Sequence, residues 1–139
     1  NQQGLERPMY LGKKKKCDAF CFHYDETELL PPNSQILASN QKSKIQAVCF
    51  ENINSKVWAV QYHPEFDPIW MSGLMDQREE ILLNEGIYNN KVEFDAYRNY
   101  FSNFKERENI KNSLSICENL SNPNLHSLEL YNWINSLHC

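Results

Sequence analysis

The chain has 139 residues, a formal net charge of −4 and 23% charged residues, so its length suits one domain with a modest core. This acidic balance does not favour nucleic acid or a membrane surface as a partner, and no apolar stretch reaches membrane-spanning length. The five cysteines are odd in number and lack CxxC or metal-like spacing, which argues against a disulfide framework and a zinc site. Their apolar neighbours predict small buried residues in a reducing compartment, so we expect a cytoplasmic protein.

The N-terminal 16 residues are polar and irregular, and they end in a run of four lysines at residues 13–16. No aromatic residue interleaves with these lysines, as would be expected of a nucleic-acid-binding patch. We therefore predict a solvated turn that leads into the first strand.

Four strands are predicted before residue 63, at residues 17–23, 35–39, 44–51 and 56–62. The last two are joined by four polar residues, a connection of hairpin length that makes them antiparallel. Residues 57–62 form a near-continuous apolar run, which is typical of a strand buried on both faces inside a sheet. Together the strands and the helices that follow predict an α/β fold with a mixed sheet.

The apolar run ends abruptly in His63, Pro64 and Glu65. In open α/β sheets, ligand-binding and active sites lie just beyond the carboxyl ends of such strands. Pro64 keeps His63 out of helical backbone space, and residues two apart in an extended segment point the same way. The Glu65 carboxylate is therefore expected to reach a ring nitrogen of His63, as the acid does in a nucleophile–base–acid triad. A surface loop with a chance His–Glu pair is the alternative, and the strand before it disfavours that interpretation.

Helices are predicted after this motif. Asp67 is an N-cap followed by proline, and Gly86 ends the first helix. The next helix is expected to have one aromatic face, made of Phe94, Tyr97, Phe101 and Phe104. Such a face more often packs in a core than lines a ligand site. We assign residues 1–104 to the main domain, and residues 105–139 to a linker and a terminal amphipathic helix that packs on the same domain.

Two motifs in this order resemble class I, triad-type glutamine amidotransferases. Residues 61–66, QYHPEF, are similar to the Q-[FY]-H-P-E-[FY] signature of that family. Upstream, HYDE at 23–26, LPP at 30–32 and LASN at 37–40 resemble the H-x-D-E…LP…LA-S segment of the branch similar to the glutaminase part of GMP synthase. NWI at 132–134 resembles the terminal helix of stand-alone members.

The resemblance implies the C-terminal part of a flavodoxin-like layered domain, followed by C-terminal helices. It implies a Cys-His-Glu triad in which His63 is the base and Glu65 orients it. It also implies that one loop borders the glutamine pocket, mainly through its main-chain atoms. This loop consists of Phe22, His23, Tyr24 and Asp25. For His23, a strand-end histidine bonded to a turn is an equally weighted structural alternative. No metal and no cofactor are expected.

The family's nucleophile elbow, G-x-C-x-G-x-Q, is absent from these 139 residues, because none of the four glycines lies two residues from a cysteine. In the family the elbow precedes the H-x-D-E segment, and the chain begins with Asn rather than Met. We therefore expect the C-terminal portion of a longer protein, inactive by itself, with the nucleophile upstream.

The leading functional hypothesis is a glutamine amidotransferase or glutaminase, which hydrolyses the glutamine side-chain amide and releases ammonia for a synthetase partner or another acceptor. One alternative is a γ-glutamyl peptide hydrolase that uses the same triad. Another is a catalytically inactive amidotransferase-like domain that serves as a binding or regulatory subunit. Assays on glutamine and γ-glutamyl dipeptides separate the first two, and a G-x-C-x-G sequence upstream separates both from the third.

Overall fold

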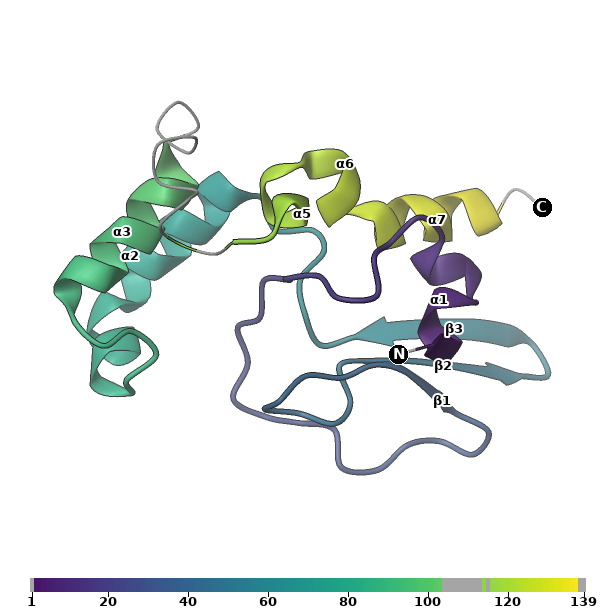
Figure 1. The fold of residues 1–139 in the computed structure, drawn as a ribbon. Coiled ribbons are helices and arrows are strands. Elements are labelled where there is room, and N and C mark those ends of the chain that lie inside the picture. The colour runs from purple at the N-terminus through teal and green to yellow at the C-terminus, as the bar shows by residue number, and fades with distance from the viewer. Residues whose placement is uncertain (1, 104–113, 115, 138–139) are drawn as a thin grey trace.

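The computed structural model describes residues 2–103, 114 and 116–137. In this part of the chain a three-stranded antiparallel sheet of order β1-β2-β3 lies at one end, and the helices α2 and α3 lie together at the other (Figure 1). The strands are β1 (Gln35–Ala38), β2 (Ala47–Asn52) and β3 (Ser55–Val60). The helices are α1 (Gln2–Leu5), η1 (Pro8–Tyr10), α2 (Pro68–Asn84), α3 (Lys91–Ser102), α5 (Glu118–Ser121), α6 (Pro123–His126) and α7 (Leu128–Ser136).

The hairpin prediction is confirmed, because β2 and β3 pair antiparallel from Ala47–Val60 to Asn52–Ser55. The prediction of a mixed sheet is wrong for the described residues, since both strand pairs are antiparallel. Residues 17–23 form no strand, and this prediction is also wrong. Among the described residues, one backbone–backbone hydrogen bond joins them to a neighbouring segment, from the His63 amide to the Phe20 carbonyl at 2.7 Å. A strand needs a ladder of such bonds, and apolar sequence alone does not supply one.

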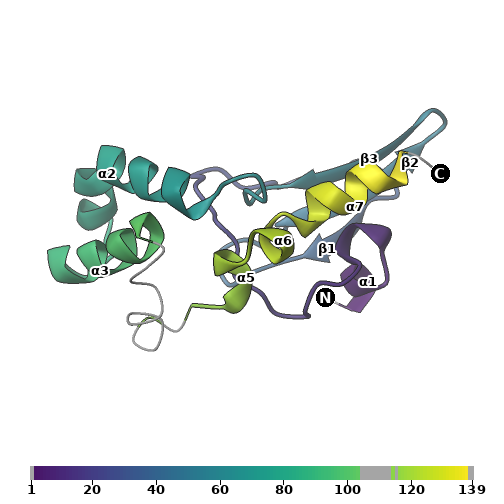
Figure 2. The same cartoon turned by 90° about the horizontal axis from the view of Figure 1, so that it is seen from above.

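Strand β3 lies at the edge of the described sheet, and the exposure of its side chains shows that the prediction of a strand buried on both faces is wrong. It ends at Val60, two residues before the predicted end, and its side chains range from exposed to half-buried. Trp58 and Val60 pack against a small core that includes Met9, Leu37 and Tyr62. Helix α7 lies over this side of the sheet, beside α1 (Figure 2). A strand is buried on both faces only where another layer packs on each face of its sheet. Among the described residues, the layer with α7 covers one face.

The helix pair is built as the sequence predicts. The Asp67 carboxylate accepts a hydrogen bond from the Trp70 amide at 2.7 Å and so caps α2, and Gly86 follows the helix with a φ of 67°. Helix α3 buries the predicted aromatic face against α2, with Phe94 and Phe101 in the core and Tyr97 half-buried. Phe104 lies outside the described residues.

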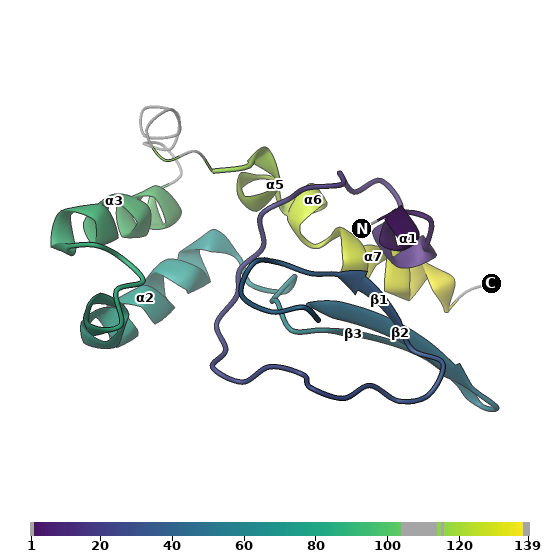
Figure 3. The ribbon, with the colours of Figure 1, turned by 60° about the horizontal axis from the view of Figure 1, so that its bottom comes forward.

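The C-terminal segment returns to the sheet end as two helices, α6 and α7, rather than one. Leu120 of α5 joins the helix core, and α7 contacts the N-terminal segment through polar groups. The Asn132 side chain donates to the carbonyls of Met9 and Leu11 at 3.0 and 3.1 Å. Of the apolar side chains expected to pack on the domain, Leu125 and Leu128 are half-buried, whereas Trp133, Ile134 and Leu137 are about half exposed or more. The long connection before β1 loops out beside the sheet before it re-enters (Figure 3).

Candidate active site

His63 and Glu65 lie just beyond β3, in the turn that leads into α2. The His63 amide is held by the Phe20 carbonyl, and the Phe66 amide donates back to the His63 carbonyl at 3.4 Å. Pro64 is buried, whereas the side chains on either side of it in the sequence project from the same side of the turn. His63 Nδ1 and Glu65 Oε1 are 2.8 Å apart, so the expected contact between them is present.

This contact determines which nitrogen of His63 is available for chemistry. An ionised carboxylate only accepts hydrogen bonds, so Nδ1 carries the proton that it donates to Glu65. The other nitrogen, Nε2, then holds the lone pair, and it has no hydrogen-bond partner in the described chain. The imidazole is 29% exposed and stacks on Phe66, with ring centroids 3.9 Å apart. Such an imidazole has the tautomer and the accessibility that a general base needs.

The electrostatics of the turn keep Glu65 ionised. Burial by itself raises the pKa of the Glu65 carboxyl, but the hydrogen bond from His63, a backbone hydrogen bond and the charges of His63 and His126 lower that pKa overall. An ionised Glu65 stabilises an imidazolium on His63, which is the state that a base reaches after it accepts a proton.

The segment Phe22, His23, Tyr24 and Asp25 lies at the surface, connected to the site by side-chain amides. His23 Nδ1 donates to the Asp25 carbonyl at 2.7 Å, so its Nε2 accepts from the Gln46 amide at 3.4 Å. The Gln61 amide donates to the same Asp25 carbonyl at 3.4 Å, and Gln61 lies two residues before His63. The side chains of Phe22 and Tyr24 make other contacts. Phe22 packs on the helix core, and the Tyr24 hydroxyl donates to Glu85 at 3.0 Å.

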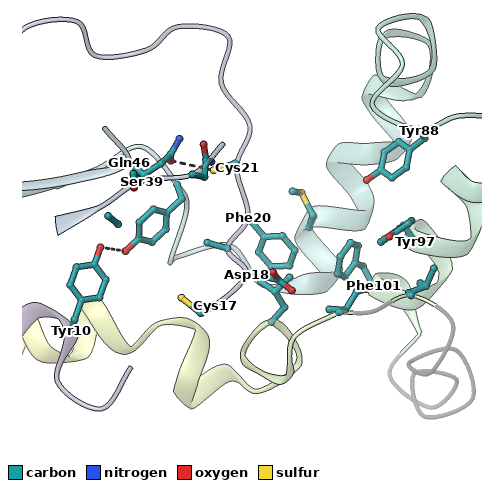
Figure 4. A pocket seen from close by; sticks show the side chains of 18 residues that line it. Tyr10, Cys17, Asp18, Phe20, Cys21, Ser39, Gln46, Tyr88, Tyr97 and Phe101 are labelled. Carbon is teal, nitrogen blue, oxygen red and sulfur yellow. Dashed lines mark hydrogen bonds between the residues drawn. The ribbon is translucent and has the colours of Figure 1, made fainter. Parts of the chain in front are cut away.

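A pocket of about 590 Å³ opens beside the pair rather than around it. Phe20 stands at its centre, with Tyr10, Gln46 and Cys21 on the sheet side and Tyr88, Tyr97 and Phe101 on the helix side (Figure 4). Tyr62 contributes to its wall, whereas His63, Glu65 and the segment 22–25 do not. The pocket therefore adjoins the backbone that holds His63.

None of the described cysteines is paired with His63. Cys17 and Cys21 are exposed and free, which makes the prediction of buried cysteines wrong at these two positions, because residues 17–23 lie outside any sheet. Desolvation of their sulfur atoms nevertheless raises the pKa of both thiols. The Cys21 thiol donates to Gln46 Oε1 at 3.5 Å. A protonated thiol is a poor nucleophile, so neither group has the environment of a catalytic thiolate.

A buried polar network behind the site was not foreseen from the sequence. Lys13 forms an ion pair with Glu129 of α7, and these side chains are only 4% and 2% exposed. Glu129 also accepts from the Tyr62 hydroxyl at 2.6 Å, and that hydroxyl lies 2.7 Å from the hydroxyl of Tyr10. The prediction of a solvated lysine turn is therefore wrong for Lys13, because a carboxylate from the far end of the chain compensates its charge. No local pattern indicates a contact between residues 116 positions apart.

In the described part of the chain, no group of three His, Cys, Asp or Glu side chains could hold a metal ion. None of the described helices is long and apolar enough to cross a membrane.

Comparison with known proteins gives two relatives. The chain is 29% identical over 139 residues to a "gamma-glutamyl-L-1-hydroxyisopropylamide hydrolase" from Pseudomonas sp, with 96% of this chain and 46% of the relative covered. Over 58 residues it is 33% identical to a "GMP synthase [glutamine-hydrolyzing]" from Caldanaerobacter subterraneus subsp. tengcongensis, with 42% of this chain and 11% of the relative covered. No protein-family model and no solved structure matches the chain. The chain thus spans less than half the length of these relatives, and the two similarities support a glutamine amidotransferase-like or γ-glutamyl hydrolase-like protein.

Proposed function

We propose that this chain carries the base and the orienting acid of an enzyme that hydrolyses γ-glutamyl amides, the class of compounds to which glutamine belongs. The observation that carries the proposal is the 2.8 Å contact between His63 Nδ1 and Glu65 Oε1, which leaves Nε2 as the available base. The similarity to a γ-glutamyl amide hydrolase along 96% of the chain supports this substrate class.

In the proposed reaction a cysteine thiol gives its proton to His63 Nε2, and the thiolate attacks the carbonyl carbon of the γ-amide. The C–N bond then breaks, and the imidazolium returns the proton to the departing nitrogen. Water, deprotonated by His63, cleaves the resulting thioester and releases glutamate. Glu65 stabilises the imidazolium in both halves of the reaction. We propose that the cysteine comes from sequence outside these 139 residues, because no glycine-flanked cysteine occurs within them.

The segment Phe22, His23, Tyr24 and Asp25 is proposed to border the pocket for the glutamyl end of the substrate. Its shape is maintained by the His23–Asp25 contact and by the side-chain amides of Gln46 and Gln61, which flank β2 and β3. We assign it a binding role through its main chain rather than a role in proton transfer. A loss of His23 is therefore expected to act on apparent substrate binding.

Residues 105–139 are proposed to belong to the same domain as residues 1–104. The Lys13–Glu129 ion pair and the Asn132 side chain join α7 to the N-terminal segment that packs on the sheet. Separation of these parts would leave Glu129 and Lys13 as uncompensated charges.

A second candidate function is a glutamine amidotransferase, in which the released ammonia passes to a synthetase partner or another acceptor. The similarity over 58 residues to a glutamine-hydrolysing GMP synthase supports this candidate. Glutamine and a γ-glutamyl alkylamide, assayed side by side, distinguish the two candidates by their kcat/KM values.

Steady-state kinetics of the complete protein test the proposal. His63→Ala is expected to lower kcat by about 10²–10⁴-fold, the range in which general acid–base catalysis contributes. Glu65→Gln is expected to lower kcat less, because it weakens the base without removing it, and His23→Ala is expected to raise KM. Glu51→Gln is the matched control, since Glu51 is also an exposed carboxylate near a cation, Lys56, but lies on β2. Wild-type turnover in a folded His63→Ala variant would refute the triad.

A further inference from the structure

Cys17 and Cys117 line the same small cavity, of about 40 Å³, between the N-terminal segment and the start of α5. Cys17 is exposed, and Cys117 is half-buried. Both thiols are free, and Cys117 makes no side-chain capping hydrogen bond although it holds the N-cap position of α5. Two thiols that are distant in the sequence therefore border a common space.

Hydrogen bonds next to the two cysteines join their segments. The Asp18 carboxylate accepts from the Cys117 amide at 2.7 Å, across 99 positions of the chain. The Asn119 side chain donates to the Asp18 carbonyl. The first of these bonds and ordinary bond lengths limit the distance between the two cysteine α-carbons to about 12 Å at most. The small cavity that both residues line indicates a shorter distance.

The backbone at both cysteines allows the approach that a disulfide needs, with α-carbons about 4.4–6.8 Å apart. Residues 17–19 belong to no helix or strand, so they can shift without breaking one. Cys117 has an extended backbone, with φ −67° and ψ 141°, and lies before the first turn of α5. Burial raises the pKa of the Cys17 thiol, and the charge of an ionised Cys117 raises that pKa further, which is consistent with two neighbouring sulfur atoms.

We propose that Cys17 and Cys117 are a reversible thiol pair, which a low-molecular-weight disulfide such as oxidised glutathione converts into an intramolecular disulfide. The thiolate of the exposed Cys17 attacks one sulfur of the oxidant, whose S–S bond breaks and releases one glutathione thiolate. The Cys117 thiolate then attacks the Cys17 sulfur of the mixed disulfide and releases the second. The two cysteines lose two electrons and two protons, and the oxidant takes them up to become two glutathione thiols.

The disulfide holds together two parts of the wall of the 590 Å³ pocket. Cys17 and Asp18 line this pocket from the N-terminal side (Figure 4). Ile116 and Leu120, on either side of Cys117, line it from the C-terminal side. Oxidation therefore fixes the separation of these two segments, and reduction releases it. This role is independent of the proposed function, because it requires neither a catalytic nucleophile nor a substrate.

The first measurement is a peptide map of the complete protein after incubation with mixtures of oxidised and reduced glutathione. The wild-type digest should contain a Cys17 peptide linked to a Cys117 peptide, and dithiothreitol should separate the two. Cys117→Ser should stop at the glutathione adduct of Cys17, and Cys17→Ser should leave Cys117 without this link. Cys21→Ser is the matched control, because Cys21 is also exposed and burial also raises its thiol pKa, and the link should form unchanged in that variant.

The second measurement needs no variant. If the fold brings the two thiols together, the equilibrium constant for the Cys17–Cys117 disulfide against glutathione should be at least about tenfold larger in the folded protein than in urea. Three results would overturn the proposal. Cys17 and Cys117 accumulate only glutathione adducts, Cys17 links mainly to another cysteine, or the folded protein shows no gain over the unfolded one.

Discussion

In the helix pair the most deeply buried side chains, among them Met75 and Phe94, are surrounded by other apolar groups. At the sheet end the buried side chains also include Lys13, Glu129 and the hydroxyl-bearing Tyr62. The helix pair therefore gains its stability from apolar packing, whereas the sheet end also depends on compensated buried charges. Apolar packing tolerates gradual change, whereas a buried ion pair is strongly destabilised when either partner is lost. The candidate site lies where the two regions meet, because Phe20 belongs to the helix core and its carbonyl holds His63.

The largest effect is expected at the ion pair. Lys13→Met leaves the Glu129 carboxylate buried without its cation and should lower the free energy of unfolding by about 3–5 kcal/mol, measured by urea denaturation. Lys14→Met is the matched control in the same lysine run. Lys14 and its partner Glu118 are 70% and 59% exposed, so that change should cost no more than about 1 kcal/mol.

The double variant Lys13→Met with Glu129→Leu sharpens this prediction. Removal of both charges removes the desolvation penalty as well as the attraction, so much of the lost stability should return. Equal losses for the Lys13 and Lys14 variants would show that the sheet end does not depend on the buried pair.

In the helix pair the corresponding test is Met75→Ala. Met75 is 1% exposed, and the cavity that the change leaves should lower the free energy of unfolding by about 2–5 kcal/mol. Val92→Ala on α3, where the side chain is 80% exposed, should change it by about 0.5 kcal/mol or less. A loss as small for Met75 as for Val92 would mean that the described contacts between α2 and α3 are not the source of its stability.

A smaller effect is expected at the start of α2. Asp67→Ala removes the acceptor for the Trp70 amide and should lower the free energy of unfolding by about 1 kcal/mol. Asp67→Asn keeps a side-chain oxygen at this position and should retain most of that stability. Thermal unfolding of the two variants provides the comparison, and an equal loss in both would assign the effect to charge rather than to capping.

The smallest change is the dependence of stability on pH, which differs between the two regions. Burial lowers the pKa of His126 below its ordinary value of 6.5, so the unfolded chain binds this proton first as the pH falls. Stability at the sheet end should therefore decline from about pH 6.5 downward, and His126→Asn should abolish that decline. In the helix pair the hydrogen bond from Arg98 lowers the pKa of Asp76 from 3.8, so its contribution is lost only in stronger acid. A pH profile from 8 to 3 for the wild type and His126→Asn tests this order.

Much of the local structure follows from nearby residues. The hairpin, the N-cap at Asp67, the end of α2 at Gly86 and the aromatic face of α3 each depend on residues a few positions apart. The contact between His63 and Glu65 belongs to the same class, because a proline between them keeps the backbone extended. These features were predictable because the physical interactions behind them are local.

The remaining features depend on which segments meet in space. An apolar run at residues 57–62 does not reveal whether layers cover both faces, and β3 lies at an edge of the described sheet. Residues 17–23 have the composition of a strand but make one backbone bond to a neighbouring segment. A lysine in a basic run becomes buried because Glu129 approaches it from α7, and the ring of His126 packs against Phe20 in the same way. The sequence by itself thus determined the contact between His63 and Glu65, whereas only the tertiary structure decided what surrounds and supports it, since desolvation and charge compensation depend on neighbours that are distant along the chain.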